Sequence, residues 1–209
     1  MLKKKFTTKQ IILTGMLAAI AGVLMSWEIP LPLMPPFYKF DFSLVPSIVG
    51  LFLMGPVEGA LIEIIKLIIK LILSGTNSMY VGELVNLMSI ILFTLPTWFV
   101  YKKLGANRKA AIIALMVGIC IKTGAECFSN AYISLPLYAK AMKISVDEIV
   151  KSVQTFNSRI TSLQSLIIYA TIPFNLFKLV VNGTIGYVIY DRLLSAMPEV
   201  SNLRSGQEA

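Results

Sequence analysis

Six long apolar segments, separated by short polar or proline-rich connections, constrain this chain more than any other feature. A helix needs about 20 mostly apolar residues to cross a bilayer, and fewer when neighbouring helices shield it. The chain has 209 residues, of which 56% are hydrophobic and only 14% charged, so water is not its main solvent. The sequence predicts an all-α integral membrane protein in which residues 1–209 form a single domain of six transmembrane helices. These helices are expected near residues 8–26, 42–54, 57–73, 81–101, 110–138 and 163–194.

The positively charged side chains lie mainly at the ends of the apolar segments. Three lysines stand within residues 1–7, and the connection after the fourth segment holds Lys102, Lys103, Arg108 and Lys109. Because cytoplasmic loops carry an excess of Lys and Arg, and because an even number of spans returns the chain to its starting side, we expect both termini to be cytoplasmic. Residues 1–7 are then a basic cytoplasmic amino terminus and residues 195–209 a flexible cytoplasmic tail. The net charge of +8 therefore indicates topology and not nucleic-acid binding.

The sixth segment places polar side chains where lipid is the expected neighbour. Asn175, Lys178 and Asn182 follow a spacing of three and four residues and share one helix face. A charged group in the hydrocarbon costs at least about 2.5 kcal/mol, so it must face protein or a water-filled cavity. No acid lies at helical spacing to pair with Lys178. Asn175, Lys178 and Asn130 of the fifth segment are therefore candidate ligand-binding residues.

Other charges at membrane depth have potential partners nearby. Lys122 and Glu126 stand four residues apart, which favours an internal ion pair. In the third segment Glu63, Lys66 and Lys70 share a face, which indicates pairing or lysines that reach toward the interface. Glu83 lies at the start of the fourth segment, near the expected outer surface.

The first segment carries small residues at helical spacing, Gly15, Ala18, Ala19 and Gly22. Small residues let two helices approach closely in a membrane. Both packing within the bundle and contact with another subunit agree with this pattern.

The motifs of the common membrane enzymes are missing from the sequence. There is no G-x-x-x-x-G-K-[ST] loop for ATP, no histidine for a metalloprotease or a serine–histidine pair, and no cluster of aspartates for Mg²⁺. The two cysteines, Cys120 and Cys127, are expected to be packing residues. The chain is predicted to be a binding or transport protein with no enzymatic activity, no metal and no cofactor.

Three motifs together resemble the substrate-binding S component of energy-coupling factor (ECF) vitamin transporters, most closely the riboflavin-specific (RibU-type) branch. They are VGELVN at residues 81–86, NAYISLPLYAK at 130–140 and PFNLFK at 173–178, in the order of that family. FDFSLVP at residues 40–46 and GPVEGALIEIIK at 55–66 agree with it. The resemblance extends from about residue 8 to residue 194.

The resemblance implies an S-component-like bundle with a riboflavin pocket near its outer face. Asn130, Asn175 and Lys178 would bind the polar edge of the flavin ring, and Glu83 would lie near the ligand. The partners it implies are a membrane-embedded coupling subunit and two ATPases, with the small residues of the first helix toward the coupling subunit. The ring is expected to be covered by apolar and aromatic side chains, Met34, Phe37, Tyr38 and Phe42.

Three alternatives remain open from the sequence. The chain could serve another vitamin, such as thiamine, biotin or a queuosine precursor. It could be a stand-alone secondary transporter coupled to protons through Glu83, Glu126 or Lys122. FMN could be accepted beside riboflavin, with Lys39 at its phosphate.

Overall fold

A computed structural model describes residues 6–32, 34, 38–76 and 79–196 of the chain. Helices dominate these residues, and a two-residue antiparallel ladder pairs Ile29 with Phe40 and Pro30 with Lys39. Much of the predicted tail, residues 197–209, lies outside the described residues, as do the first five residues and Phe37. In chain order the elements are α1 (Thr8–Ser26), β1 (Ile29–Pro30), β2 (Lys39–Phe40), α2 (Leu44–Leu53), α3 (Pro56–Ser74), α4 (Val81–Lys103), α5 (Arg108–Ser129), η1 (Asn130–Ser134), α6 (Leu135–Met142), α7 (Val146–Gln154), α8 (Leu163–Leu166), η2 (Ile167–Thr171) and α9 (Ile172–Ala196).

All six predicted segments are helical. The π-helical turn η1 joins α5 to α6, and the π-helical turn η2 joins α8 to α9, so each pair forms one long helical unit. Within the described residues, the helical units long and apolar enough to cross a membrane are Thr8–Ser26, Val81–Lys103, Arg108–Met142 and Leu163–Ala196. By contrast, α2 has only 10 residues. α3 has 19, but it carries Glu58, Glu63, Lys66 and Lys70. The predicted count of six transmembrane helices is therefore not confirmed.

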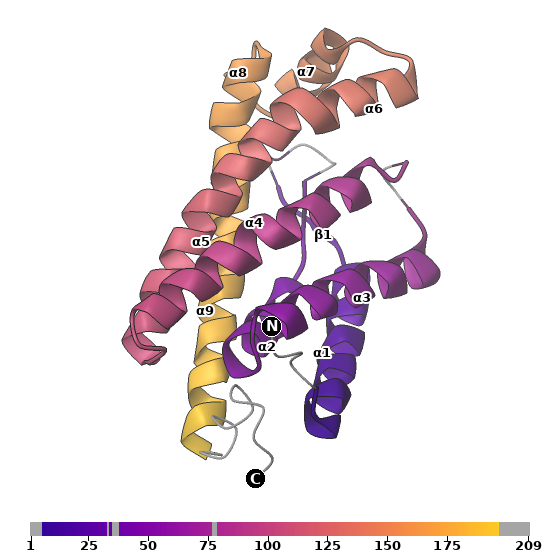
Figure 1. Cartoon of the computed structure of the whole chain (residues 1–209). Coiled ribbons are helices and arrows are strands. Elements are labelled where there is room, and N and C mark those ends of the chain that lie inside the picture. The colour runs from indigo at the N-terminus through magenta and orange to yellow at the C-terminus, as the bar shows by residue number, and fades with distance from the viewer. Residues whose placement is uncertain (1–5, 33, 35–37, 77–78, 197–209) are drawn as a thin grey trace.

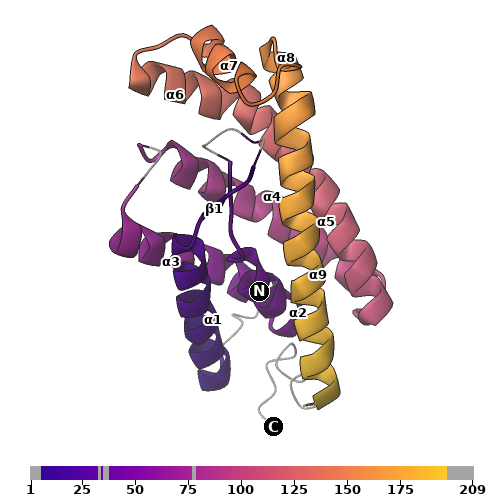
Figure 2. The ribbon, with the colours of Figure 1, turned by 180° about the vertical axis from the view of Figure 1, so that it is seen from behind.

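The helices are arranged between two distinct ends of the molecule (Figures 1 and 2). α6, α7 and α8 gather at one end, whereas the start of α1, the turn between α4 and α5, and the end of α9 lie toward the other. A salt bridge of 2.7 Å from Arg108 Nε to Asp191 Oδ1 joins the start of α5 to the last turns of α9. α9 runs along most of the length of the molecule, and α2 and α5 both contact it.

Local sequence signals set the helix boundaries. Thr7 caps α1 because its hydroxyl accepts from Gln10 N while the Gln10 side chain accepts from Thr7 N. Gly55 separates α2 from α3 with a φ of 136°, a conformation that favours glycine, and Pro56 begins the next helix. The polar connection between the last two predicted helices contains α7, whose apolar side chains Ile149, Val150 and Val153 are buried.

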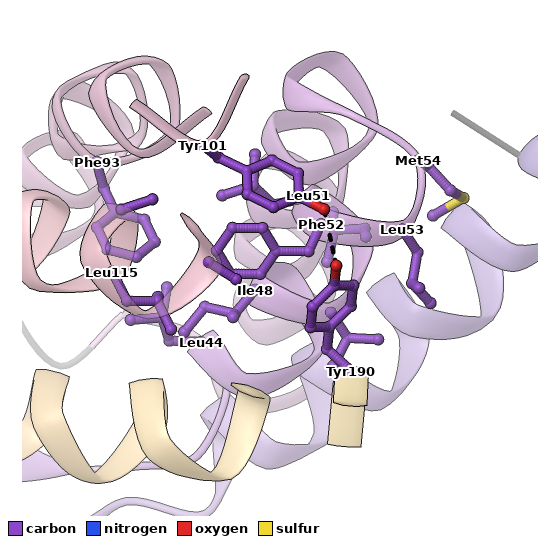
Figure 3. Close-up of a cluster of buried hydrophobic side chains, with 14 of the residues drawn as sticks. Leu44, Ile48, Leu51, Phe52, Leu53, Met54, Phe93, Tyr101, Leu115 and Tyr190 are labelled. Carbon is purple, nitrogen blue, oxygen red and sulfur yellow. Dashed lines mark hydrogen bonds between the residues drawn. The ribbon is translucent and has the colours of Figure 1, made fainter. Parts of the chain in front are cut away.

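The main core lies where α2 meets α4, α5 and α9 (Figure 3). Phe52 packs between Tyr101 and Tyr190, whose hydroxyl groups lie 2.7 Å apart, so both phenols are hydrogen-bonded inside an apolar cluster. α2 also approaches α9 closely, since a Cβ atom built on Gly186 would lie 2.8 Å from Ile48 Cγ2. This packing fixes the position of α9, which carries the polar residues described next.

Candidate functional site

Two π-helical turns lie side by side above the core. η1 begins at Asn130, η2 ends at Thr171, and the two turns contact each other. A π-helical turn interrupts the regular hydrogen-bond ladder of an α-helix, and such turns occur frequently at functional sites. Asn130 Nδ2 donates to the carbonyl of Glu126 at 2.9 Å, and Asn175 Nδ2 donates to the carbonyl of Thr171 at 3.0 Å. Both asparagines are thereby tied to their own helices one turn back.

The amide oxygens of these two asparagines remain available as acceptors. Asn130 and Asn175 are not bonded to each other, and no hydrogen bond to either Oδ1 atom comes from the described part of the chain. Asn175 is 8% exposed, whereas Asn130 is half-buried. A side-chain amide offers one acceptor and two donors, and here the acceptor is the group left for a ligand.

An aromatic cluster lies at the junction of η2 and α9, close to Asn175. The Tyr38 hydroxyl lies 2.6 Å from Thr171 Oγ1, and the Tyr38 ring stacks on Phe174 with a centroid distance of 4.9 Å. Burial raises the pKa of the Tyr38 phenol, so this side chain stays neutral. Of the other side chains predicted to cover a ligand, Phe42 packs edge-on against Phe40, and Met34 packs against the apolar cluster that includes Tyr38.

Lys178 is paired with an acid that helical spacing could not reveal. Its Nζ atom lies 2.6 Å from Asp41 Oδ2 and 3.4 Å from the carbonyl of Lys39, both in the segment that precedes α2. Burial alone would raise the pKa of the Asp41 carboxyl, but the ammonium groups of Lys178 and Lys66, with hydrogen bonds from Lys178 and Ser43, lower it to about 2. Asp41 is therefore ionised at neutral pH.

Glu83, the fourth predicted site residue, has a different environment. Its Oε1 atom accepts from Lys70 Nζ at 2.6 Å, and its Oε2 atom accepts from Thr76 Oγ1 at 3.1 Å. Both the Glu83 and the Lys70 side chains are buried, so this pair joins the start of α4 to the last turns of α3. The structure thus places Glu83 in an ion pair between α3 and α4, whereas Asn175 and Lys178 lie on α9.

The predicted internal ion pairs are present. Glu126 Oε1 accepts from Lys122 Nζ at 3.2 Å and from Ser89 Oγ at 2.7 Å. Lys66 Nζ lies 2.7 Å from Glu63 Oε1 and 3.1 Å from Ser43 Oγ. Lys66 and Lys70 of α3 therefore form buried ion pairs, with Glu63 and Glu83, and do not extend toward the membrane–water interface.

The small residues of α1 divide into two groups. Ala18 is fully buried, and a Cβ atom built on Gly22 would lie 2.5 Å from Ile69 Cγ2, so both residues lie on the buried side of α1 and Gly22 packs against α3. Gly15 and Ala19 are exposed, and nothing lies within 4 Å of a Cβ atom on Gly15. Of these four small residues, only Gly15 and Ala19 are therefore exposed on the outer side of α1.

The site around α9 combines neutral acceptors, a paired ammonium and aromatic rings. This set suits a planar, uncharged ligand with a polar edge. An apolar pocket of about 290 Å³ between α3 and α4, lined by Pro56, Val57, Ala60, Leu61, Ile64 and Leu95, offers no polar side chain for such an edge. Among the described residues no group of His, Cys, Asp or Glu could hold a metal ion.

Helical spacing predicted Asn130, Asn175 and Lys178 as candidate ligand-binding residues, but it gave no indication of Asp41 or Thr171. Asp41 is the acid of FDFSLVP, a motif that supported the family resemblance without a role for the carboxylate. Thr171 is ordinary in an apolar helix, and only the π-helical turn and the contact with Tyr38 distinguish it.

Comparison with known proteins agrees with this architecture. The chain is 30% identical over 186 residues to the riboflavin transporter FmnP of Bacillus subtilis (strain 168), an alignment covering 88% of this chain and 92% of that protein. It is 29% identical over 192 residues to the riboflavin transporter RibU of Staphylococcus aureus (strain TCH60), covering 92% and 94% of the two chains. It is 28% identical over 185 residues to RibU of Lactococcus lactis subsp. cremoris (strain NZ9000), covering 83% and 87%.

A solved structure is also similar to this fold. It is described as "Structure and mechanism of the S component of a bacterial ECF transporter", and it matches with a TM-score of 0.69 and 28% identity over 90% of this chain and 97% of that one. The family described as "ECF transporter, substrate-specific component" matches residues 9–190. The chain therefore belongs to the family of substrate-specific components of ECF transporters.

Proposed function

We propose that this chain is the riboflavin-binding subunit of an ATP-driven vitamin importer. The observation that carries this function is that Asn175 and Lys178 lie beside the stacked rings of Tyr38 and Phe174, with Asn130 at the start of the neighbouring turn η1. Riboflavin has a planar ring whose pyrimidine-like edge alternates acceptors with an N–H donor. Free amide oxygens can accept from that N–H, and an ammonium can donate to a ring carbonyl. Relatives in this family that cover most of the chain are named riboflavin transporters.

The work of this subunit is capture and delivery, with no chemical change in the vitamin. Riboflavin enters from outside the cell, is held in the site, and is released inward when partner subunits hydrolyse ATP. The chain itself has no phosphate-binding loop, so hydrolysis falls to two ATPases acting through a membrane-embedded coupling subunit. Exposed Gly15 and Ala19 on α1 are the candidate contacts for that coupling subunit.

The proposed location is the bacterial cytoplasmic membrane with both termini inside. In this arrangement α2 and α3 complete six transmembrane helices. The charges of α3 favour this, because Glu58, Glu63, Lys66 and Lys70 are all buried, whereas large apolar side chains such as Ile68 and Ile72 are exposed. The basic turn between α4 and α5 then lies on the cytoplasmic side with the start of α1 and the end of α9.

The ion pair at Lys39 favours riboflavin over FMN. Lys39 Nζ lies 2.6 Å from Glu28 Oε2, so its charge is already balanced within the segment that links α1 to α2. A phosphate there would have to displace or approach a carboxylate. We therefore expect the uncharged vitamin to be the better ligand.

Titration of the purified chain tests the function. The protein is taken from riboflavin-starved cells and titrated with riboflavin while flavin fluorescence is followed; saturable tight binding is expected. FMN, thiamine and biotin serve as competitors, and displacement by thiamine or biotin at lower concentration than riboflavin would reassign the vitamin. Vesicles that contain only this chain should show no uptake driven by a proton gradient, which separates the importer subunit from a proton-coupled transporter.

A further inference from the structure

The Asp41–Lys178 ion pair is unequal in its exposure to solvent. The two residues are 137 positions apart, and the Oδ2 and Nζ atoms lie 2.6 Å from each other. The Asp41 side chain is 6% exposed, whereas that of Lys178 is 25% exposed. The carboxylate is therefore enclosed by protein, while the Lys178 side chain is partly exposed, and its Nζ atom also lies 5.9 Å from the ring centroid of Phe174.

The hydrogen bonds of Lys178 leave one donor without an acceptor. A lysine ammonium carries three N–H groups. One points to Asp41 Oδ2 and one to the carbonyl of Lys39, and no third acceptor is found among residues 6–32, 34, 38–76 and 79–196. Asp41 thus accepts one N–H group of the Lys178 ammonium. Because this contact fixes how the ammonium is rotated, it also fixes the direction in which the remaining N–H group points.

Asp41 itself is held by contacts other than its ion pair. Its Oδ1 atom accepts from Ser43 N at 2.9 Å, and its backbone carbonyl accepts from Asn182 Nδ2 at 3.0 Å. Asn182 is fully buried and also donates to the carbonyl of Lys178 at 2.9 Å. One amide therefore ties the backbone of Asp41 to the helix turn that carries Lys178. The carboxylate is a fixed anchor, and a group whose orientation is fixed by its neighbours binds with less loss of freedom.

The Asp41–Lys178 ion pair also supplies the counter-charge that an uncharged ligand cannot provide to the ammonium. A lone ammonium in a low-dielectric site needs a counter-charge, which riboflavin cannot supply. With the Asp41 carboxylate in contact, Lys178 can donate to a neutral carbonyl while the site as a whole stays neutral.

We propose that Asp41 is a positioning residue of the ligand site, which orients and neutralises the Lys178 ammonium so that its free donor meets the polar edge of the flavin. This role rests on the proposed function, because it takes Lys178 as a ligand contact. Asp41 does not touch the flavin itself, and its whole effect on affinity passes through Lys178.

A double-mutant cycle on riboflavin affinity tests this role in the full chain. We expect Asp41→Asn, which keeps the shape of the side chain and removes its charge, to weaken riboflavin binding at least about tenfold. Lys178→Met should weaken it similarly or more. The double variant Asp41→Asn/Lys178→Met should bind no more than about threefold more weakly than Lys178→Met alone, because without the ammonium there is nothing left to position.

Asp191→Asn is the control. Asp191 is also a carboxylate 2.7 Å from a cationic nitrogen, but its partner Arg108 is not a proposed ligand contact, and the pair lies toward the other end of α9 from Lys178. Any general cost of neutralising an ion pair of α9 appears in this variant as a lower unfolding temperature, with riboflavin affinity within about threefold of the unmodified chain. A loss of affinity equal to that of Asp41→Asn would overturn the positioning role.

The outcomes separate this role from the function on which it rests. If the unmodified chain does not bind riboflavin, the proposed function fails. If it binds but Asp41→Asn binds equally well or more tightly, Asp41 does not position Lys178. If Asp41→Asn does not fold, the double variant Asp41→Asn/Lys178→Met decides, because it removes both charges of the pair. If this variant binds riboflavin much more weakly than Lys178→Met does, Asp41 acts independently of Lys178, and the positioning role is overturned.

Discussion

The hydroxyl groups of Tyr38 and Thr171 lie 2.6 Å apart, although 133 residues separate them in the chain. This contact joins the segment before β2 to the last residue of η2. Thr171 is fully buried and Tyr38 is 6% exposed, so neither hydroxyl has water as a ready substitute partner. The contact therefore helps to hold the segment between α1 and α2 against α9.

Tyr38→Phe should lower the free energy of unfolding by about 1 to 2 kcal/mol, because it leaves the buried Thr171 hydroxyl without this partner. Thermal unfolding in detergent measures the effect. Tyr132→Phe is the control, since Tyr132 is 70% exposed and should change stability little. Equal unfolding temperatures for the two variants would show that the Tyr38 hydroxyl contributes nothing.

The helices could be predicted from the sequence because their signal is local. A run of apolar residues beginning after Thr7 gave the bounds of α1, residues 8–26, which the structure confirms. The sequence did not predict α7 because its five charged and polar positions break up the three buried apolar residues, so that no continuous apolar run marks the helix.

The candidate site could be predicted only in part, for a related reason. The spacing of Asn175 and Lys178 is visible along one helix, but the pairing of Lys178 with Asp41 depends on how a proline-rich segment folds back onto α9. No periodicity encodes that contact. The same limit applies to Gly22, whose place against Ile69 follows from helix packing and not from the small-residue spacing itself.

Gly22→Ala should destabilise the chain by about 1 to 3 kcal/mol, because the added methyl group would overlap Ile69 of α3. Gly15→Ala is the control, since its methyl group would meet nothing within 4 Å. Unfolding in detergent distinguishes them. If both variants unfold alike, α1 and α3 do not pack as closely as the structure has them.

A larger residue at the exposed position tests the proposed subunit contact separately. Gly15→Leu should leave riboflavin binding and unfolding temperature nearly unchanged, since Gly15 faces outward. It should reduce co-purification with the coupling subunit, because a small residue permits close approach of another helix. Full recovery of the assembled complex with this variant would remove Gly15 from the interface.

Asn130→Ala and Asn175→Ala should each weaken riboflavin binding by about 1 to 3 kcal/mol, because a flavin donor would then be buried without an acceptor. Fluorescence titration gives the affinities. Asn157→Ala provides the comparison, since the Asn157 amide oxygen accepts only a local hydrogen bond from Arg159 N among the described contacts. If the three variants bind alike, the free amide oxygens do not contact the ligand.

The pKa of Asp41 sets an expected dependence of stability on pH. Its value of about 2 in the folded chain lies below the ordinary value of 3.8, so the folded state favours the ionised carboxylate. The resulting stabilisation, about 2 kcal/mol, is fully present above about pH 4 and is lost as the pH falls through 2, where both states bind the proton. The free energies of unfolding of the unmodified chain and of Asp41→Asn should therefore differ most near neutral pH. The difference should shrink as the pH falls from 4 to 2. A constant difference across that range would mean that the carboxylate is not held ionised by Lys178 and Lys66.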